Sequence, residues 1–368
     1  MTLSIYEQLK VKTAVNAWGT VTKVGGSKMA PEVLEAMAEA SKHYVEIAAL
    51  HEAAGRRVAE LLGVEACCIT CGAAAGIAIS AAACMTRGDA AKKLQLPDTT
   101  GMPDEALVLK CHRTLYDQAM LLSGVKAKEI GTVSFACVEQ VEAAISDRSA
   151  FFFYASEAEP MRGSIDLNKI IPILKKRNVP VVVDAAAEVP PKSNIRKYLD
   201  MGADLVIFSG GKELRGPQSS GLILGGTSLI AACDANCCPN YSIGRSMKID
   251  KETIAGIVKA VELFAAKDYD KQIAIWESMV HRITEELSKS PYATVREGFP
   301  IEPGIQPADL LRAYVKPTRK SAERLYTELL ERDPQIYTGL SGHELAVNPQ
   351  CLEEEEIPVL VKAFKELL

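Results

Sequence analysis

The chain of 368 residues contains no apolar run that approaches the length of a membrane span. Its first residues, Met-Thr-Leu-Ser-Ile-Tyr-Glu, do not resemble a signal peptide. The net charge of −5 argues against a nucleic-acid-binding surface, which would need a basic stripe. There are no internal repeats and no low-complexity tracts. These absences predict a cytoplasmic globular protein that acts on a small molecule and binds neither a membrane nor a nucleic acid.

Histidine is scarce near the cysteines, which bears on metal binding. The ten cysteines lie in apolar strands and alanine-rich helices, so buried reduced thiols are expected rather than the disulfides of a small secreted domain. Cys233, Cys237 and Cys238 form one cluster of three thiols. No histidine lies nearby to complete a structural zinc site, and we therefore expect no metal.

The chain shows an alternation of helical patterns and short apolar strands over residues 46–250. This alternation predicts an α/β protein with a mainly parallel sheet and helices on both faces. Residues 1–45 are expected to form an N-terminal arm and helix, and residues 251–368 a connecting helix and a small C-terminal α/β domain that ends in a helix over 353–368. Residues 92–104 are expected to be a surface loop, either a lid or an insertion. The expected strands are 66–70, 107–110, 151–155, 179–183, 205–209 and 221–224.

One of these strands ends in a glycine-rich turn that carries a single amine. Its sequence is Asp204-Leu-Val-Ile-Phe-Ser-Gly-Gly-Lys212. Partial burial and the nearby charge of Arg215 are expected to lower the pKa of Lys212, as required of a lysine that forms a Schiff base. The alternative is a solvated lysine in a loop between a strand and a helix.

Two further segments complement this lysine. Asp184 follows the strand 179–183 at the edge where open α/β sheets bind ligands, where a carboxylate can keep a pyridine nitrogen protonated. Its alternative is a helix cap. Cys71-Gly-Ala-Ala-Ala-Gly76 opens a helix with small residues whose free N–H groups can bind a phosphate, although close helix packing would also require small residues. Together the three segments predict a site for pyridoxal 5'-phosphate (PLP).

The order of these motifs resembles the fold type I (aspartate-aminotransferase-like) PLP enzymes, and within them the selenocysteine synthase-like group that includes D-glucosaminate-6-phosphate ammonia-lyase. The resemblance covers almost the whole chain and implies a homodimer or higher homo-oligomer with active sites at the subunit boundary. It is carried by Asn16-Ala-Trp-Gly-Thr20, Gly25-Gly-Ser27, Cys71-Gly-Ala-Ala-Ala-Gly76, His112-Arg113, Tyr116-Asp117, Asp184-Ala-Ala, Ser209-Gly-Gly-Lys212, Leu214-Arg-Gly-Pro-Gln218 and Ile243-Gly-Arg245-Ser-Met-Lys248.

The resemblance also implies roles for single residues. Lys212 would carry the cofactor and remove the Cα proton, and Asp184 would hold the ring nitrogen. His112 would stack on the ring and, with Tyr116 as a weaker candidate, help protonate a departing hydroxyl, unless it only orders a strand end. The other cofactor contacts would be Cys71, Gly72, Ala73, Ala74, Ala186 and Ser209.

Substrate recognition would fall to basic residues and to the arm. Arg215 and Arg245 would each grip an anion, one the substrate carboxylate and the other, or Lys248, a distal acidic group. Each arginine has the alternative of a surface or interface ion pair. Asn16 and Thr20 would touch substrate, unless they serve a turn or the packing of the arm.

The function implied is a PLP-dependent lyase. Such an enzyme would catalyse α,β-elimination from a 2-amino-3-hydroxy acid to give ammonia and a 2-keto acid, with a phosphorylated sugar amino acid such as D-glucosaminate 6-phosphate as substrate. A PLP-dependent racemase, aldolase or transaminase is the first alternative, and a catalytically silent PLP-binding protein is the second. Selenium transfer to seryl-tRNA is disfavoured because the chain is acidic and opens directly into the catalytic arm.

Overall fold

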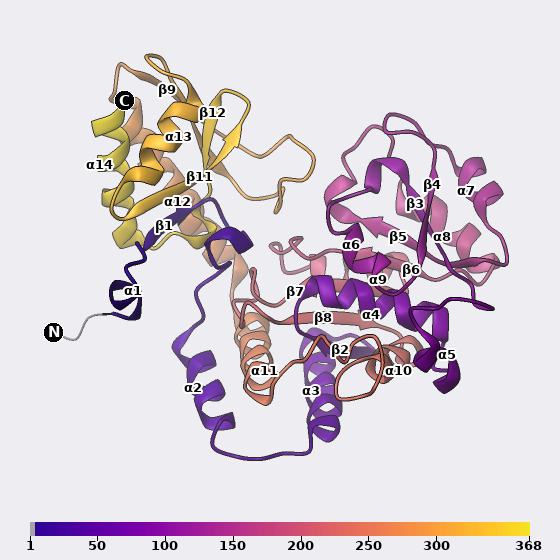
Figure 1. The fold of residues 1–368 in the computed structure, drawn as a ribbon. Helices are drawn as coiled ribbons and strands as arrows, with labels where there is room; N and C mark the ends of the chain where they lie inside the picture. Colours follow the sequence, from indigo (N-terminus) through magenta and orange to yellow (C-terminus); the bar gives the residue numbers. More distant parts are fainter. Residues whose placement is uncertain (1–3) are drawn as a thin grey trace. The chain divides into compact units, whose positions relative to one another are not determined.

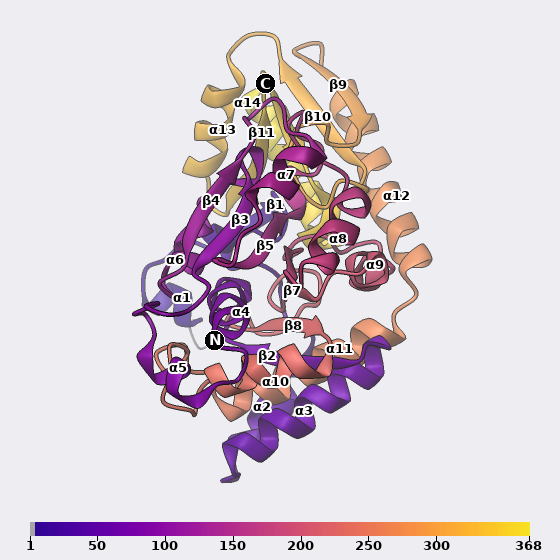
Figure 2. The same cartoon turned by 90° about the vertical axis from the view of Figure 1, so that its right-hand side faces the viewer.

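The computed structural model describes residues 4–368, so the first three residues of the expected arm lie outside the described part. The described chain forms two compact units, a larger one of Met29–Lys267 and a smaller one of residues 4–28 with Asp268–Leu368. The predicted boundaries at 45 and 250 are therefore displaced. Helix α11 (Lys251–Ala266) packs on α2 (Pro31–Ala40) and α3 (Ile47–Leu62), and this keeps all three helices in the larger unit (Figure 2).

The larger unit is built on a seven-stranded sheet with the order β2-β8-β7-β6-β5-β3-β4 (Figure 1). All neighbouring strands are parallel except β8, which runs antiparallel to β2 and to β7. The predicted mainly parallel sheet is confirmed. The strands are β2 (Ala66–Thr70), β3 (Glu105–Leu109), β4 (Lys126–Ile130), β5 (Ser149–Ala155), β6 (Val181–Asp184), β7 (Leu205–Ser209) and β8 (Gly221–Gly225). The sequence pattern did not predict β4, because this edge strand is largely charged, as edge strands often are.

Both faces of this sheet are covered. Helix α4 (Ala73–Thr86) packs across β5, β6, β7 and β8, and its residues 76–86 are all buried. Phe151 and Phe153 of β5 join the core on the α4 side, whereas Tyr154 points to the other face and contacts Tyr198 of α9 (Asn194–Met201). Strands buried on both faces are apolar throughout rather than alternating, which explains the continuous apolar sequences of β5 to β7.

Four of the remaining helices of the larger unit lie between its strands in the chain, and α10 follows the last strand, β8. They are α5 (Ala90–Gln95), α6 (Asp117–Leu121), α7 (Val138–Ala144), α8 (Leu167–Lys176) and α10 (Thr227–Asn236). The expected loop over 92–104 begins inside α5. Asp89 caps this helix by accepting hydrogen bonds from the N–H groups of Ala91 (2.9 Å) and Lys92 (3.1 Å).

The smaller unit contains a five-stranded sheet with the order β1-β11-β12-β10-β9. Strand β1 pairs in parallel with β11, so the indigo N-terminal strand lies beside a strand near the C-terminus in Figure 1. The strands are β1 (Ala14–Ala17), β9 (Ala293–Gly298), β10 (Arg312–Pro317), β11 (Gln335–Ser341) and β12 (Glu344–Val347). The helices are α1 (Ile5–Gln8), α12 (Tyr269–Ser288), α13 (Ala322–Glu331) and α14 (Ile357–Leu367).

The long helical pattern expected after residue 250 is divided into α11 and α12. Asp268 stands at the break and caps α12 by accepting a hydrogen bond from Lys271 N (3.2 Å). The last helix begins at Ile357, after a short 3-10 turn over Glu354–Glu356, rather than at the predicted residue 353. Within residues 4–368, no helix is long and apolar enough to cross a membrane.

Candidate active site

The sequence motifs of the larger unit meet at one edge of its sheet. The strand ladders align Ala155 with Asp184, Asp184 with Ile207, Ser209 with Gly221, and Gly221 with Thr70. The segments that follow β2, β5, β6 and β7 therefore leave the sheet side by side. This is the carboxyl edge of the parallel strands, where α/β sheets bind ligands.

The turn after β2 forms a phosphate cradle. Gly72 is the N-cap of α4 with a φ of +133°, which favours glycine, and no side chain caps the helix. Its carbonyl accepts hydrogen bonds from Thr70 Oγ1 (2.9 Å) and Gly76 N (3.0 Å), while the N–H groups of Ala73 and Ala74 belong to the uncapped first turn. Such a helix start favours an anion. The predicted phosphate loop thus fits a phosphate through its backbone.

Gly221, the first residue of β8, lies directly against this turn. A Cβ atom on Gly221 would lie 2.5 Å from the carbonyl carbon of Gly72 and 2.8 Å from Ala73 N. Only glycine therefore lets β8 approach the turn. Cys71 is half-buried, and burial raises the pKa of its thiol, so its side chain is neutral and only a weak hydrogen-bond donor.

Lys212 is held by a closed loop after β7. Gly216 N donates to Gly210 O (2.8 Å), Arg215 N donates to Lys212 O (3.0 Å), and Gly210 N donates to Ser220 O (2.8 Å). Burial lowers the pKa of Lys212, as predicted. Asp184, Glu157 and Glu188 act in the opposite direction and raise the pKa of Lys212, and a contribution of Arg215 stays a prediction.

Asp184 ends β6 beside this lysine. Its Oδ1 accepts a hydrogen bond from Ala186 N (3.1 Å), which fixes the carboxylate orientation. Burial raises the pKa of Asp184, whereas the Lys212 charge and the Ala186 N–H lower it. The next helix, α9, begins only at Asn194, so the helix-cap alternative is wrong. The carboxylate is available to a cationic ring nitrogen.

His112 differs from the role that the resemblance implied. Its side chain is 0% exposed, and its ring centroid lies 4.3 Å from that of Tyr154. Nδ1 accepts a hydrogen bond from Ala155 N (3.2 Å), so the ring proton is on Nε2, which lies 2.8 Å from Ser164 Oγ. Burial lowers the pKa of His112 to about 4, so the ring is neutral at pH 7. With no open ring face, His112 corresponds to the alternative, a histidine that orders the end of β5.

Sequence reasoning missed two carboxylates of this edge. Glu157 lies in the 3-10 turn Ser156–Ala158 directly after β5, and Glu188 follows β6. Both interact electrostatically with Lys212, as Asp184 does. Tyr116 is 55% exposed. Partial burial raises its pKa, and the nearby charges of Glu157 and Asp184 raise it further. The position of Glu157 directly after the expected strand 151–155 was a usable signal.

The predicted anion-binding residues lie on two separate loops. Arg215 is half-buried on the lysine loop with a φ of +54°, near the Glu213–Lys267 ion pair of 3.6 Å. Arg245 and Lys248 are exposed on the segment after α10. A buried charge pair at Arg245 is therefore absent from the described chain, and its role toward a substrate stays a prediction.

Asn16 and Thr20 belong to the smaller unit. Asn16 Oδ1 accepts from Trp18 N (3.1 Å) and Gly19 N (3.2 Å), and its Nδ2 donates to Gly19 O (2.9 Å). Thr20 is buried. The Asn16 amide thus holds the turn after β1, as the alternative proposed, and substrate contact by either residue stays a prediction.

Cys68, Cys233 and Cys237 lie together where β2 packs against α10. Cys68 Sγ lies 3.4 Å from Cys237 Sγ, and burial with neighbouring thiols raises the pKa of Cys68 and Cys233. All ten cysteines are free thiols. Across residues 4–368, no group of three or more histidine, cysteine or acidic residues is arranged to hold a metal ion.

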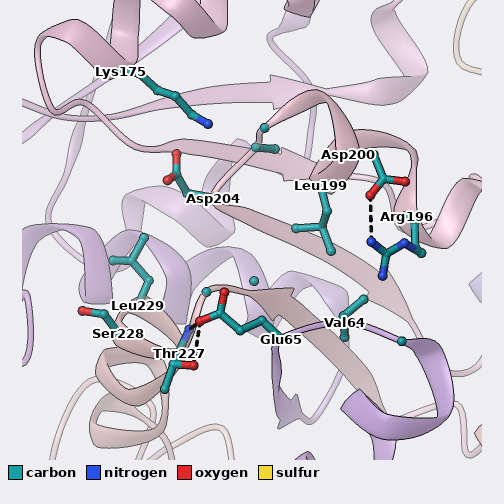
Figure 3. Close-up of a pocket in the computed structure, with 15 residues that line it drawn as sticks. Val64, Glu65, Lys175, Arg196, Leu199, Asp200, Asp204, Thr227, Ser228 and Leu229 are labelled. Atoms are coloured by element: carbon teal, nitrogen blue, oxygen red, sulfur yellow. Dashed lines mark hydrogen bonds and ion pairs between the residues drawn. The ribbon is translucent and has the colours of Figure 1, made fainter.

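A hollow of about 530 Å³ lies at the opposite edge of the same sheet (Figure 3). It lies where β7 begins and β8 ends, and it is lined by Glu65, Asp204, Thr227 and neighbouring residues. Glu65 Oε1 accepts hydrogen bonds from both Thr227 N and Thr227 Oγ1, each 2.7 Å, so this start of α10 is already capped by a carboxylate. The hollow lies at the edge opposite to Lys212 and is therefore separate from the candidate site.

The mainly parallel sheet, with Lys212, Asp184 and the uncapped start of α4 at one edge, is the arrangement of a fold type I PLP enzyme. A serine palmitoyltransferase of S. paucimobilis solved with PLP shares the fold, with a TM-score of 0.59 at 12% identity over 97% of this chain and 87% of that one. Residues 115–293 match the family model described as SelA, L-seryl-tRNA selenium transferase.

Two curated proteins and one solved structure are more similar. D-Glucosaminate-6-phosphate ammonia lyase of Salmonella typhimurium is 36% identical over 293 residues, 78% of this chain and 76% of its own. A solved structure of D-glucosaminate-6-phosphate ammonia-lyase has a TM-score of 0.86 at 30% identity and covers 100% of this chain and 98% of that one. The 5'-C-glycyluridine monooxygenase-decarboxylase of a Streptomyces species is 32% identical over 374 residues, 99% of this chain and 92% of its own.

The chain belongs to the selenocysteine synthase-like family of PLP enzymes that includes D-glucosaminate-6-phosphate ammonia-lyase. The cofactor is PLP, as in its relatives, and the residues described above fit it. The start of α4 would bind the phosphate of PLP, and Asp184 would bind its ring nitrogen. Lys212 would bind its aldehyde carbon.

Proposed function

We propose that this chain is a carbon–nitrogen lyase that converts a 2-amino-3-hydroxy acid into a 2-keto acid and ammonia. The proposed substrate is a phosphorylated sugar amino acid such as D-glucosaminate 6-phosphate. The observation that carries the proposal is the meeting of Lys212, Asp184 and the uncapped start of α4 at one sheet edge. The similarity to D-glucosaminate-6-phosphate ammonia-lyase over the full chain in structure supports the same reaction.

The residues divide the work of the elimination. PLP, when bound, supplies the electron sink that makes the Cα proton acidic. Lys212 Nζ takes this proton, and it can do so because burial favours its neutral amine. Asp184, oriented by Ala186 N, keeps the proton on the ring nitrogen. The Cβ hydroxyl leaves as water, and a water is consumed when the C–N bond is hydrolysed, so the net loss is ammonia.

A second candidate function is favoured by one observation. The monooxygenase-decarboxylase of Streptomyces aligns over 99% of this chain, more than the 78% aligned with the Salmonella ammonia lyase. An enzyme of that kind would consume O₂ and release CO₂. The lyase is the better proposal because of its identity of 36% and its TM-score of 0.86.

A substrate panel separates these functions. The purified enzyme loaded with PLP is given D-glucosaminate 6-phosphate, the same acid without phosphate, and both enantiomers of serine, and ammonia, 2-keto acid, CO₂ and O₂ are measured. The expected result is equimolar ammonia and 2-keto acid without O₂ uptake, fastest with the phosphorylated acid. Racemised or transaminated substrate without ammonia would favour the other PLP enzymes, and no turnover of any compound would favour a silent binder.

We also infer a setting and an assembly for this enzyme. The ten free cysteines support the reducing cytoplasm. The family resemblance supports a homo-oligomer, at least a dimer, in which a second chain would cover the exposed segment of Arg245 and Lys248 and complete the site.

A further inference from the structure

The departing Cβ hydroxyl needs a proton, because hydroxide is a poor leaving group without an acid. Lys212 and Asp184 are committed to the Cα proton and to the ring nitrogen. His112 cannot serve, because it is fully buried and its pKa is lowered to about 4, so it holds no acidic proton at pH 7. Glu157 and Tyr116 are the other titratable groups whose fields reach Asp184.

The topology places Glu157 at the reacting edge. Ala155, the last residue of β5, is the ladder partner of Asp184, and Glu157 follows two residues later in the 3-10 turn. Its carboxyl is half-buried and lies in one electrostatic cluster with Lys212, Asp184 and Glu188. Lys212 and the three acids therefore act on one another at this edge.

We propose that Glu157 is a catalytic acid of this site, whose carboxyl proton passes to the Cβ hydroxyl oxygen as the Cβ–O bond breaks. This proposal rests on the lyase function proposed above. The electrons of the Cα–H bond form the Cα=Cβ bond while the proton goes to Lys212 Nζ. The Cβ–O electrons leave with oxygen as water. Lys212 returns its proton at Cβ, and hydrolysis releases ammonium, whose extra proton restores Glu157 through solvent.

The surroundings of Glu157 suit an acid. Burial raises the pKa of Glu157, the charges of Asp184 and Glu188 raise it further, and Lys212 lowers it. A donor works best when its pKa is close to the working pH. The pKa of Tyr116 is raised above its ordinary value of 10.0, so the phenol is the weaker acid.

The same turn offers a matched control. Glu159 lies two residues after Glu157, but its Oε2 accepts from Lys197 Nζ (2.8 Å) and Tyr198 Oη (3.1 Å) of α9. Removing its charge changes an ion pair with α9 and leaves the Lys212 cluster intact, because Glu159 does not act on Lys212.

The first experiment separates proton removal from hydroxyl loss. Glu157→Gln, Glu157→Asp, Glu159→Gln and Tyr116→Phe are given D-glucosaminate 6-phosphate in D₂O, and ammonia release and deuterium at Cα of recovered substrate are measured. In Glu157→Gln, ammonia release should fall about 10²- to 10⁴-fold while Cα exchange continues. Glu157→Asp should recover part of the loss, and Glu159→Gln should match the unaltered enzyme.

Three outcomes would overturn the proposal: unchanged ammonia release in Glu157→Gln, equal losses of exchange and release, or the uncoupled pattern in Tyr116→Phe instead. If the unaltered enzyme releases ammonia from no hydroxy amino acid, the lyase function fails and the role of Glu157 as hydroxyl donor falls with it.

A second experiment uses the cofactor-free protein and does not depend on turnover. Glu157 is one of the carboxylates that raise the pKa of Lys212, so Glu157→Gln should lower that pKa. The pH dependence of Lys212 acetylation, followed by mass spectrometry of the peptide, reports the change, and Glu159→Gln should give none. An unaltered Lys212 titration in Glu157→Gln would contradict the placement of Glu157, whether or not the lyase function holds.

Discussion

Lys212 leaves β7 on a loop closed by three backbone hydrogen bonds, so the loop can keep its shape without the lysine side chain. Lys212→Ala should therefore lose the covalently held cofactor and nearly all turnover, while the free energy of unfolding changes by only about 0.5 kcal/mol. Borohydride reduction followed by peptide mass spectrometry should find the cofactor on Lys212 in the unaltered protein. The exposed Lys176 is the control, since Lys176→Ala should keep this adduct. An adduct on another lysine would contradict the assignment.

His112 should make the stability of the larger unit depend on pH. Its pKa falls from 6.5 to about 4 on folding, so the unfolded chain binds the extra proton between these values. The free energy of unfolding should thus fall as pH drops from 7 to 4, by about 3 kcal/mol from this residue. Urea unfolding of the unaltered protein and of His112→Asn at both pH values measures the contribution of His112 to this pH dependence.

The comparison between variants is needed because another group titrates in the same range. Burial raises the pKa of Asp234 to about 6, and this acts in the opposite direction. The Asp234 contribution cancels in the difference between the two proteins. An equal pH dependence in both would show that His112 is not buried in its neutral form.

At the scale of elements, the phosphate cradle depends on the contact between the start of β8 and the turn before α4. Gly221→Ala would place a Cβ atom 2.5 Å from the Gly72 carbonyl carbon, so the turn must move. PLP affinity should fall at least about 10-fold, and stability should fall by about 1–3 kcal/mol from overpacking. Cofactor titration by absorbance and urea unfolding measure the two effects.

Gly226→Ala, just beyond the other end of β8, is the matched control. A Cβ atom there would meet only Glu65 side-chain oxygens at 3.8 and 3.9 Å, an ordinary contact. This variant should bind PLP normally. A loss of affinity in both variants would mean that β8 as a whole, and not the Gly221 contact, supports the cradle.

At the scale of the whole molecule, the exposed segment with Arg245 and Lys248 connects assembly to specificity. If a second chain covers it and it binds a distal phosphate, Arg245→Ala should weaken kcat/KM for a phosphorylated substrate by about 1.5–3 kcal/mol, the range for a hydrogen bond to a charged group. Serine should be affected little. Equal losses for both substrates would assign Arg245 to the fold or the interface.

Sedimentation of the same samples tests the assembly itself. A dimer or larger species is expected at the concentrations at which the enzyme is active, because the family resemblance implies active sites at the subunit boundary. An active monomer would contradict the proposed completion of the site by a second chain. If the Arg245→Ala protein still assembles, its loss of activity can be assigned to substrate binding and not to assembly.

The sequence by itself determined the sheet and the cofactor, and it placed the proposed site residues at one edge of the sheet. Apolar strands that alternate with helices identify a parallel sheet, and polar residues at the ends of those strands must meet at one edge. This local pattern was sufficient to predict that Asp184, Ser209, Lys212 and the turn at Gly72 lie at the same edge of the sheet. It was also sufficient for the family, because these motifs are continuous in the chain.

Only the tertiary structure decided which groups contact one another across that edge. Burial of His112 against Tyr154, the carboxylates around Lys212 and the placement of α11 in the larger unit all depend on residues far apart in the sequence. Burial and pairwise charge set the pKa values of such groups, and neither quantity is encoded in a local pattern. The same reason explains why Glu157 became a candidate acid only once β5 and β6 were paired.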